Sequence, residues 1–341
     1  MRNVNSGLGR YETTFAWSSS TSPLFAMCPI ILLTGRNDRQ NAPGYLYYNA
    51  KDMKLFSGMS RGLIFSLATA FLWACSLVNT RYLLLKGEDP LNLTVWIGLI
   101  MIPPWIYILG KHREEYQALS PKFKWYLVGI GVISSVGLNY LQSITLLHSP
   151  AANFAFLYRT IVVFTIILAY IFFKEAISVK KWILAGLILF GSFLLTTNGK
   201  GIHLTTGDIY TLVYALSAAF ISNILIKHTI SRMHPDISGA AISIVSSVAL
   251  FIFAVGIGAL RVSGHIPFII LGSALSLGIT MVRNRAYKHA TASFVTMIVS
   301  LTPVFVTILS YPLLHERLDV YQLLGGAVIV GSMFFVERFK I

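Results

Sequence analysis

Arg159 is the residue of this sequence whose type and depth point most directly to chemistry. It follows Pro150 by nine residues in a run of mostly apolar residues, so in a helix it would lie about 13 Å into an apolar layer about 30 Å thick. A charge at that depth is costly and usually faces a cavity or a partner group. We expect its guanidinium to hold a carboxylate or phosphate through two parallel hydrogen bonds. The alternative is a structural arginine that donates to backbone carbonyls or to Asn139 and Gln142.

Polar and aromatic residues in neighbouring apolar stretches are candidates for the rest of a substrate-binding cavity. An amide inside an apolar helix either bonds a neighbouring helix or lines a polar cavity. An aromatic ring either lines a pocket or packs in the core. The predicted substrate-binding residues are Arg159, Asn139, Tyr158, Asn79, Asn223 and Trp73.

Charged residues near the ends of apolar stretches have a different expected role. Arg283 and Arg285 are expected to extend to the aqueous interface, with contact to an anionic substrate as the alternative. For Glu175 and Glu316, capping of helix ends is favoured over proton coupling. None of the 13 acidic residues lies in the middle of an apolar stretch.

Motifs that would indicate an enzyme lack their essential parts. The run His315-Glu-Arg-Leu-Asp319 is missing the second histidine of a zinc-protease helix, and no P-loop lysine motif occurs. The two cysteines, Cys28 and Cys75, cannot form a metal-binding set by themselves. We therefore expect no catalytic residue, no metal site, no cofactor and no enzymatic activity.

Composition predicts the surroundings of these residues. Hydrophobic residues make up 55% of the 341, charged residues 12%, and the mean hydropathy is +0.69, whereas a soluble domain is about 25% charged. The chain is therefore predicted to be an integral membrane protein in contact with lipid. The net charge of +14 is attributed to basic residues that flank apolar stretches, so no nucleic-acid partner is expected.

Ten stretches are long and apolar enough to span a bilayer. The predicted spans are 61–85, 93–110, 124–147, 151–173, 181–198, 207–228, 238–260, 266–287, 291–314 and 320–338. Residues 1–58 do not share this pattern. They are interpreted as a disordered cytoplasmic tail, as the result of a start assigned too early with Met53 or Met59 as the initiator, or as a targeting segment.

One stretch of the chain occurs twice. Residues 148–179 and 289–320, which are 141 positions apart, align without gaps and share nine identical residues. A period of this length indicates a duplicated half-protein, with repeats at 59–199 and 206–338. Because each half holds an odd number of spans, five, the second must be inverted relative to the first. The predicted fold is an all-α membrane protein of ten transmembrane helices in two inverted five-helix repeats.

Basic residues predict the orientation of these spans. Fourteen of those near span ends fall on the side of Arg61, against four on the other side, namely Lys86, Lys200, Arg261 and Arg317. The side rich in Lys and Arg normally faces the cytoplasm. We therefore expect a multi-pass protein of the cell (inner) membrane with both termini in the cytoplasm.

The second repeat carries a recognisable pattern. Ser300-Leu-Thr-Pro-Val-Phe305 is followed by Glu316-Arg-Leu318 and then by Gly325 and Gly331. The first repeat departs from it, since Val162 stands in place of the proline. With ten spans in two halves, the pattern resembles the EamA-type transporters of the drug/metabolite transporter superfamily. The resemblance covers about residues 60–338 and implies a carrier of small metabolites without specifying the substrate.

These observations predict a secondary transporter that exports a small anionic or zwitterionic, amino-acid-like metabolite by alternating access between the two repeats. Its expected partners are this small-molecule substrate and membrane lipid, and the protein is expected to be a monomer or a homodimer. Two alternatives stay open: a non-transporting membrane partner of a lipid-modifying complex, and a drug exporter. An exporter of cationic drugs would need a carboxylate deep in a span, and the sequence has none.

Overall fold

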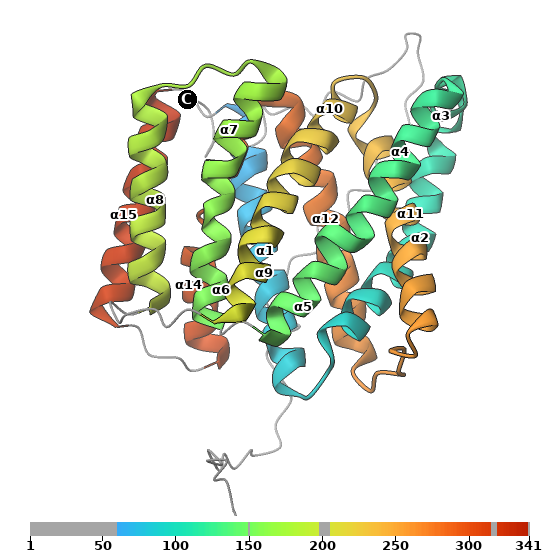
Figure 1. Cartoon of the computed structure of the whole chain (residues 1–341), viewed down its shortest axis with the longest axis horizontal. Coiled ribbons are helices and arrows are strands. Elements are labelled where there is room, and N and C mark those ends of the chain that lie inside the picture. The colour runs from blue at the N-terminus through green and yellow to red at the C-terminus, as the bar shows by residue number, and fades with distance from the viewer. Residues whose placement is uncertain (1–59, 149–150, 198–204, 315–318, 340–341) are drawn as a thin grey trace, which may run out of the picture. The chain divides into compact units, whose positions relative to one another are not determined.

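The structure of this chain is a computed structural model that describes residues 60–148, 151–197, 205–314 and 319–339. All of these belong to the second of two units, Met1–Asp52 and Met53–Ile341, into which the chain divides. The expected tail, residues 1–58, lies outside the described residues. In the described part the regular elements are all helical, and ten helical spans are long and apolar enough to cross a membrane (Figure 1). The ten predicted spans are confirmed, with ends shifted by a few residues.

The first half supplies five spans. They are α1 (Arg61–Leu85); α2 (Pro90–Lys111); α4 (Pro121–Ser134) with the π-helical η4 (Ser135–Tyr140) and α5 (Leu141–His148); α6 (Ala151–Leu157) with the 3-10 turn η5 (Tyr158–Thr160) and α7 (Ile161–Phe173); and α8 (Val179–Thr197). A short α3 (Arg113–Ala118) links the second span to the third. Helix starts follow local signals, since the Asp89 carboxylate accepts from the Asn92 N–H at 2.8 Å immediately before Pro90.

The second half repeats this order. Its spans are α9 (Thr206–Ala218) with the π-helical η6 (Ala219–Leu225) and α10 (Ile226–Ile230); α11 (Pro235–Gly256); α12 (Ile266–His289); α13 (Ala292–Val299) with α14 (Thr302–Leu314); and α15 (Val320–Phe339). The two halves run in opposite directions through the bundle, because the first span of the second half runs parallel to the fourth span of the first half. The starts of these two spans meet where Asp208 of α9 contacts Asn153 of α6. Their ends meet where Lys227 of α10 contacts Glu175 after α7.

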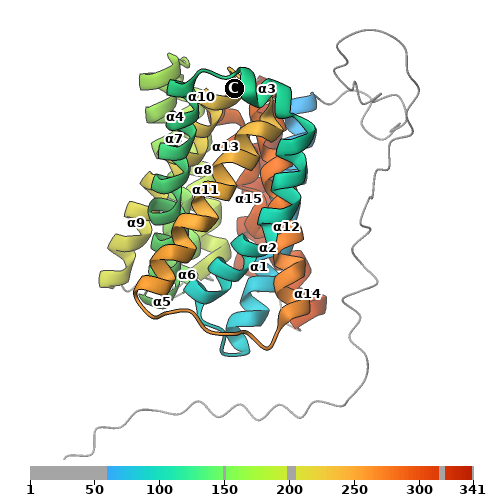
Figure 2. The same ribbon diagram turned by 90° about the vertical axis from the view of Figure 1, so that its right-hand side faces the viewer.

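The packing of the helices is nearly unchanged when the halves are exchanged. Equivalent spans pack against each other as α2 with α11, α7 with α13, and α8 with α15. The contact of α1 with α12 has its counterpart in the contact of α9 with α5. Figures 1 and 2 show α8 and α15 side by side, with α2 and α11 packed together elsewhere in the bundle. The chain is therefore built as two inverted five-helix repeats around a pseudo-two-fold axis.

Glycines allow the fifth spans, α8 and α15, to touch through their backbones. A Cβ placed on Gly191 would lie 2.8 Å from the Gly325 carbonyl oxygen, and one on Gly325 would lie 2.5 Å from the Gly191 oxygen. Both distances are shorter than any real side chain tolerates. Close backbone approach of this kind is the usual basis of helix association within a membrane, where burial from water contributes little.

Four spans depart from regular α-helix. The fourth span of each half breaks at equivalent positions, at Tyr158–Thr160 in the first half and between Val299 and Thr302 in the second. The third and sixth spans, which pack together, carry the π-helical segments η4 and η6, whereas α1 and α12 remain α-helical throughout. Irregular turns of this type leave backbone groups free to adjust and often occur at functional sites.

Candidate substrate pocket

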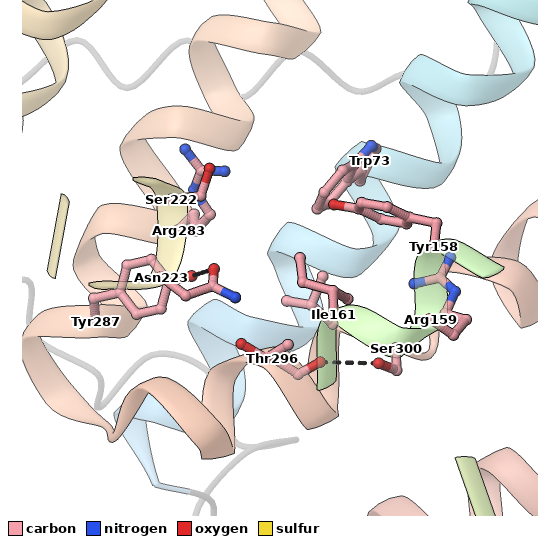
Figure 3. Close-up of a pocket in the computed structure, with 11 residues that line it drawn as sticks. Trp73, Tyr158, Arg159, Ile161, Ser222, Asn223, Arg283, Tyr287, Thr296 and Ser300 are labelled. Carbon is pink, nitrogen blue, oxygen red and sulfur yellow. Dashed lines mark hydrogen bonds between the residues drawn. The ribbon is translucent and has the colours of Figure 1, made fainter. Parts of the chain in front are cut away.

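A small cavity lies between the two halves (Figure 3). Its volume is about 30 Å³, which leaves room for one or two water molecules. Both halves contribute to its wall. The lining residues are Trp73, Tyr158, Arg159, Ile161, Ser222, Asn223, Arg283, Tyr287, Thr296, Val299 and Ser300. A solute larger than one or two water molecules does not fit in the cavity in this conformation.

Arg159 lies in the 3-10 turn of the fourth span and is 6% exposed. Its Nε is buried without a hydrogen-bond partner, and within the described ranges no acceptor or carboxylate pairs with its guanidinium. Neither Asn139 nor Gln142 accepts from it there, as the structural alternative required. The guanidinium carbon lies 5.7 Å from the centroid of the Tyr158 ring. A buried, unpaired guanidinium at a cavity wall is placed to bind an anion.

Arg283 also lines the cavity, contrary to the expectation that it extends to the aqueous interface. Figure 3 shows it on the wall opposite Arg159. Its Nε is likewise buried and has no partner among the described residues. Arg285, two residues further along α12, instead donates to the Asp236 carboxylate at 3.0 Å. Residues two positions apart point to different sides of a helix, so the interfacial interpretation fits Arg285 and fails for Arg283.

Hydrogen bonds connect cavity-lining residues of the second half to the first half. The Tyr287 hydroxyl donates to the Asn223 side-chain oxygen, and the Asn223 amide nitrogen donates to the Thr165 hydroxyl of α7 at 2.7 Å. Asn223 therefore both lines the cavity and joins two helices. The sequence left two alternatives for such an amide, a bond between helices and a place in the cavity wall, and Asn223 has both.

Aromatic rings form the wall beside Arg159. Trp73 meets Tyr158 edge to face, with ring centroids 6.1 Å apart. Tyr158 in turn stacks on Tyr214, with centroids 5.2 Å apart. Of the six residues predicted from the sequence, the structure brings together Arg159, Tyr158, Asn223 and Trp73 at this cavity.

The two remaining predicted residues lie away from the cavity and bond other helices. The Asn79 amide nitrogen donates to the Phe268 carbonyl of α12 at 3.0 Å. The Asn139 amide nitrogen donates to the Ser246 hydroxyl of α11 at 3.0 Å. Both amides are satisfied by neighbouring helices, which is the common role of an amide within a membrane.

A charged cluster lies at the end of α7, where it joins the two halves. The Glu175 carboxylate accepts from the Ala292 N–H at 2.9 Å, the Ser293 hydroxyl at 2.7 Å and the Lys227 ammonium at 3.3 Å. Burial raises the pKa of Glu175, but Lys227, Ser293 and the Ala292 N–H outweigh it and hold the pKa below its ordinary value. Glu175 thus caps the first turn of α13 in the opposite half.

This cluster lies about one helical turn from two residues that line the cavity. Lys227 lies four residues, one helical turn, beyond the cavity residue Asn223. Ala292 lies one turn before Thr296, which also lines the cavity. The bonds of the cluster therefore connect the first and second halves close to the cavity. Glu316, the equivalent of Glu175 in the repeat, lies outside the described residues.

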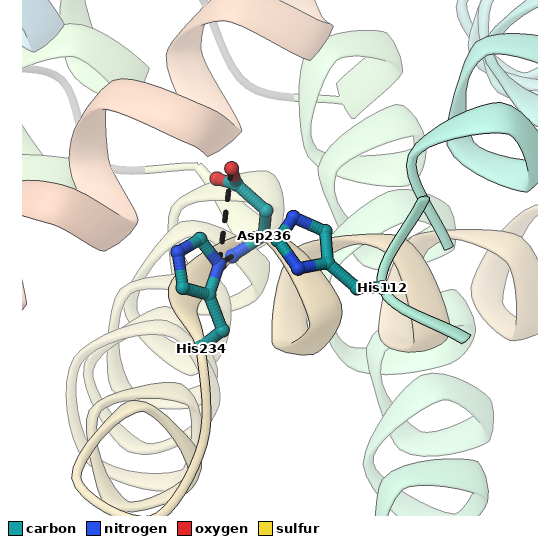
Figure 4. A group of neighbouring side chains, drawn as sticks. All are labelled: His112, His234 and Asp236. Carbon is teal, nitrogen blue, oxygen red and sulfur yellow. Dashed lines mark hydrogen bonds and ion pairs between the residues drawn. The ribbon is translucent and has the colours of Figure 1, made fainter. Parts of the chain in front are cut away.

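A second cluster of polar side chains connects the two halves. It lies where the link between α2 and α3 meets the link between α10 and α11. The side chains of His112, His234 and Asp236 face one another, with ligand atoms within 4.8 Å (Figure 4). These residue types can bind a transition metal. However, the His234 Nδ1 accepts from the Asp236 N–H at 3.3 Å and the Asp236 carboxylate is paired with Arg285. The two rings stack with centroids 4.5 Å apart, so the group fits a hydrogen-bonded contact better than a metal site.

Ten apolar spans in two inverted repeats, with a charged cavity between the repeats, define a multi-pass membrane protein of the carrier type. The chain matches the EamA-like transporter family over residues 60–197 and 205–338. It therefore belongs to this family, and the resemblance inferred from the second repeat is confirmed.

Two individual comparisons agree with this assignment. The chain is 26% identical over 249 residues to an uncharacterized transporter of Synechocystis sp., covering 67% of this chain and 72% of that protein. A solved crystal structure superimposes with a TM-score of 0.68, covering 82% of this chain and 98% of that chain. Its sequence identity of 13% makes it evidence for the fold alone. The chain is thus a membrane transporter by family and by relative.

Proposed function

We propose that this transporter exports a small anionic or zwitterionic metabolite across the cell membrane by alternating access between its two repeats. The observation that carries the proposal is Arg159, which is buried at the cavity between the repeats and has no partner for its charge among the described residues. An anionic group of the solute would supply that partner through charge-assisted hydrogen bonds. Family membership supports the transport class and leaves the solute open.

Reconstitution of the purified chain in liposomes tests this proposal. Candidate solutes come from a comparison of metabolites outside cells with and without the expressed protein. Flux of such a solute in liposomes is expected for the wild type and is expected to be abolished by Arg159→Ala. Arg159→Lys is expected to retain weak flux, because lysine keeps the charge and loses the two-pronged bond. Full flux by a stable Arg159→Ala protein would rule out anion binding by this residue.

The same liposomes separate the proposal from a non-transporting partner of a lipid-modifying complex. Such a partner would produce no flux when it is reconstituted alone. Export of cationic drugs is disfavoured by the charges. The acidic residues that fall within the ten spans, Asp208, Asp236 and Glu337, all lie in the first or last turn of a helix, and the described cavity is lined by arginines instead.

The proposal includes an orientation with both termini in the cytoplasm. A single cysteine at Glu114, which is exposed in α3, should be shielded from an impermeant thiol reagent in intact cells in an otherwise cysteine-free protein. A cysteine at Val262, which is 88% exposed in the link between α11 and α12, should be labelled. The reverse pattern would invert the assigned orientation.

A further inference from the structure

We infer that the transported solute carries two separate anionic groups, one bound by Arg159 and the other by Arg283. This inference rests on the proposed function and narrows its substrate class from an anion or zwitterion to a dianion. It starts from the unexpected position of Arg283 at the cavity wall. It then follows from the charge balance of the cavity and from the placement of the two guanidinium groups.

The two arginines share a state that other charged residues of the bundle do not share. The Nε of each is buried, and no hydrogen-bond or ion-pair partner is present for either side chain in the described part of the chain. Arg285 pairs with Asp236 at 3.0 Å, and Lys227 pairs with Glu175 at 3.3 Å. Arg285 and Lys227 are thus neutralised by carboxylates, whereas the two arginines that line the cavity have no such partner among the described residues.

The charge of the cavity matches a dianion better than a solute with one anionic group or a zwitterion. Its eleven lining residues include two arginines and no Asp or Glu. A solute with one anionic group would leave one guanidinium, with its Nε buried, without a counter-charge, which is unfavourable where water is largely excluded. A zwitterion would add an ammonium that finds no carboxylate on this wall and is repelled by the second arginine. Two anionic groups compensate both charges.

The placement of the arginines indicates that the two anionic groups are separated. Figure 3 shows Arg159 beside Tyr158 and Ser300 on one wall, and Arg283 beside Ser222 on the opposite wall. They therefore suit two groups at the two ends of a solute better than one group held twice. Trp73 and Tyr158 lie on the side of Arg159, and the apolar side chain of Ile161 lies between the two arginines (Figure 3).

Each half of the molecule contributes one of these arginines at a position where the other half is neutral. With the repeat offset of 141 residues, Arg159 corresponds to Ser300 and Arg283 corresponds to Gln142. The pair therefore lies across the boundary between the halves. A solute that binds both arginines would hold the two halves together around itself, and a solute that binds one of them would not.

The inference is tested first by the chemistry of the exported solute. Metabolites outside cells that express the wild type are compared with those outside cells that express Arg159→Ala, and the solute that differs is identified by mass spectrometry. We expect a solute with two acidic groups. A solute with one acidic group, or a zwitterion with no net charge, would overturn the inference and leave the proposed function intact. The absence of any differing solute would count against the proposed function itself.

The second test assigns the second acidic group to Arg283. The identified solute and its monoamide, in which one acidic group is neutralised, are compared in liposomes for the wild type, Arg283→Gln and the matched control Arg285→Gln. The wild type should prefer the diacid by at least about tenfold, the effect of one charge-assisted bond. Arg283→Gln should lose most of that preference and Arg285→Gln should keep it. An unchanged preference in Arg283→Gln would overturn the assignment even where Arg159 remains essential.

Discussion

The fourth spans of the two halves, α6–η5–α7 and α13–α14, have the same backbone plan and different chemistry. Both break at equivalent positions beside the cavity. At the break the first half carries Arg159 without a partner, whereas the second carries Ser300, whose hydroxyl donates to the Thr296 carbonyl at 2.9 Å. Duplication therefore preserved the irregular turn that exposes a side chain to the cavity. The residue at the break differs between the halves, so under the proposed function recognition of the solute would be asymmetric on a symmetric scaffold.

The largest effect on transport is expected when the break in the fourth span of the first half is given the residue of the second half. Arg159→Ser gives the first half the residue of the second, and transport is expected to fall by about 10- to 100-fold because a charge-assisted bond to the solute is lost. The matched control, Ser300→Ala, removes a hydroxyl already bonded within its own helix and should keep most of the activity. Flux in liposomes measures both, alongside the melting temperature. A large loss of stability in Arg159→Ser would instead identify Arg159 as a structural residue.

Separating the helices that support the two breaks should have the next largest effect. Gly191→Ala places a methyl group 2.8 Å from the Gly325 oxygen, and we expect it to lower the free energy of unfolding by about 1–3 kcal/mol. Gly186→Ala in the same helix meets nothing within 4 Å and should be neutral or slightly stabilising. Thermal unfolding of both variants checks this difference. Equal melting temperatures would show that α8 and α15 do not depend on backbone contact.

Removing the bond between the end of α7 and the start of α13 should have an effect on stability of about the same size, and one that depends on pH. Glu175→Gln weakens bonds to Lys227 and Ser293 and should cost about 1.5–3 kcal/mol near neutral pH. Because the pKa of Glu175 in the folded protein lies below its ordinary value of 4.5, its stabilising contribution is present above about that pH and is lost as the pH falls through the folded value. The melting temperatures of wild type and Glu175→Gln should therefore converge in acid. A constant difference down to low pH would contradict this.

A residue away from both breaks should have the smallest effect on transport. Asn139→Ala removes one bond, to Ser246 of α11, and should lower stability by about 1 kcal/mol with transport preserved. Asn223→Ala removes an amide that lines the cavity and bonds both Tyr287 and Thr165, so its transport should fall. Equal transport by the two variants would show that the cavity wall on the second half does not contact the solute.

Much of this architecture follows from the sequence because it depends on quantities that the sequence displays directly. Length and hydropathy define the ten spans, and the depth of Arg159 follows from counting residues from Pro150. The direction of a side chain around its helix depends on packing, and that information is missing from a count. Asn79, Asn139 and Asn223 looked alike in the sequence for this reason, and one of the three reaches the cavity.

Arg283 was left out of the predicted substrate-binding residues for a related reason, although contact with an anionic substrate was the alternative for it. Six residues from the end of α12, it lies close enough to the helix end for its long side chain to reach water, and this made an interfacial position the default. A signal was nevertheless present. The repeat aligns Arg283 with Gln142, a polar residue within an apolar span.

The unequal placement of the π-helical segments has a thermodynamic consequence. A perfectly duplicated inverted repeat would populate its inward- and outward-facing states equally, because exchanging the halves converts one state into the other. Here η4 and η6 interrupt the third and sixth spans, whereas their counterparts α12 and α1 are regular. Each such difference adds a free energy to one state alone, and about 1.4 kcal/mol shifts the ratio of the two populations tenfold. Under the proposed alternating access, the resting bias between the two states would therefore be set by the places where the two halves have diverged.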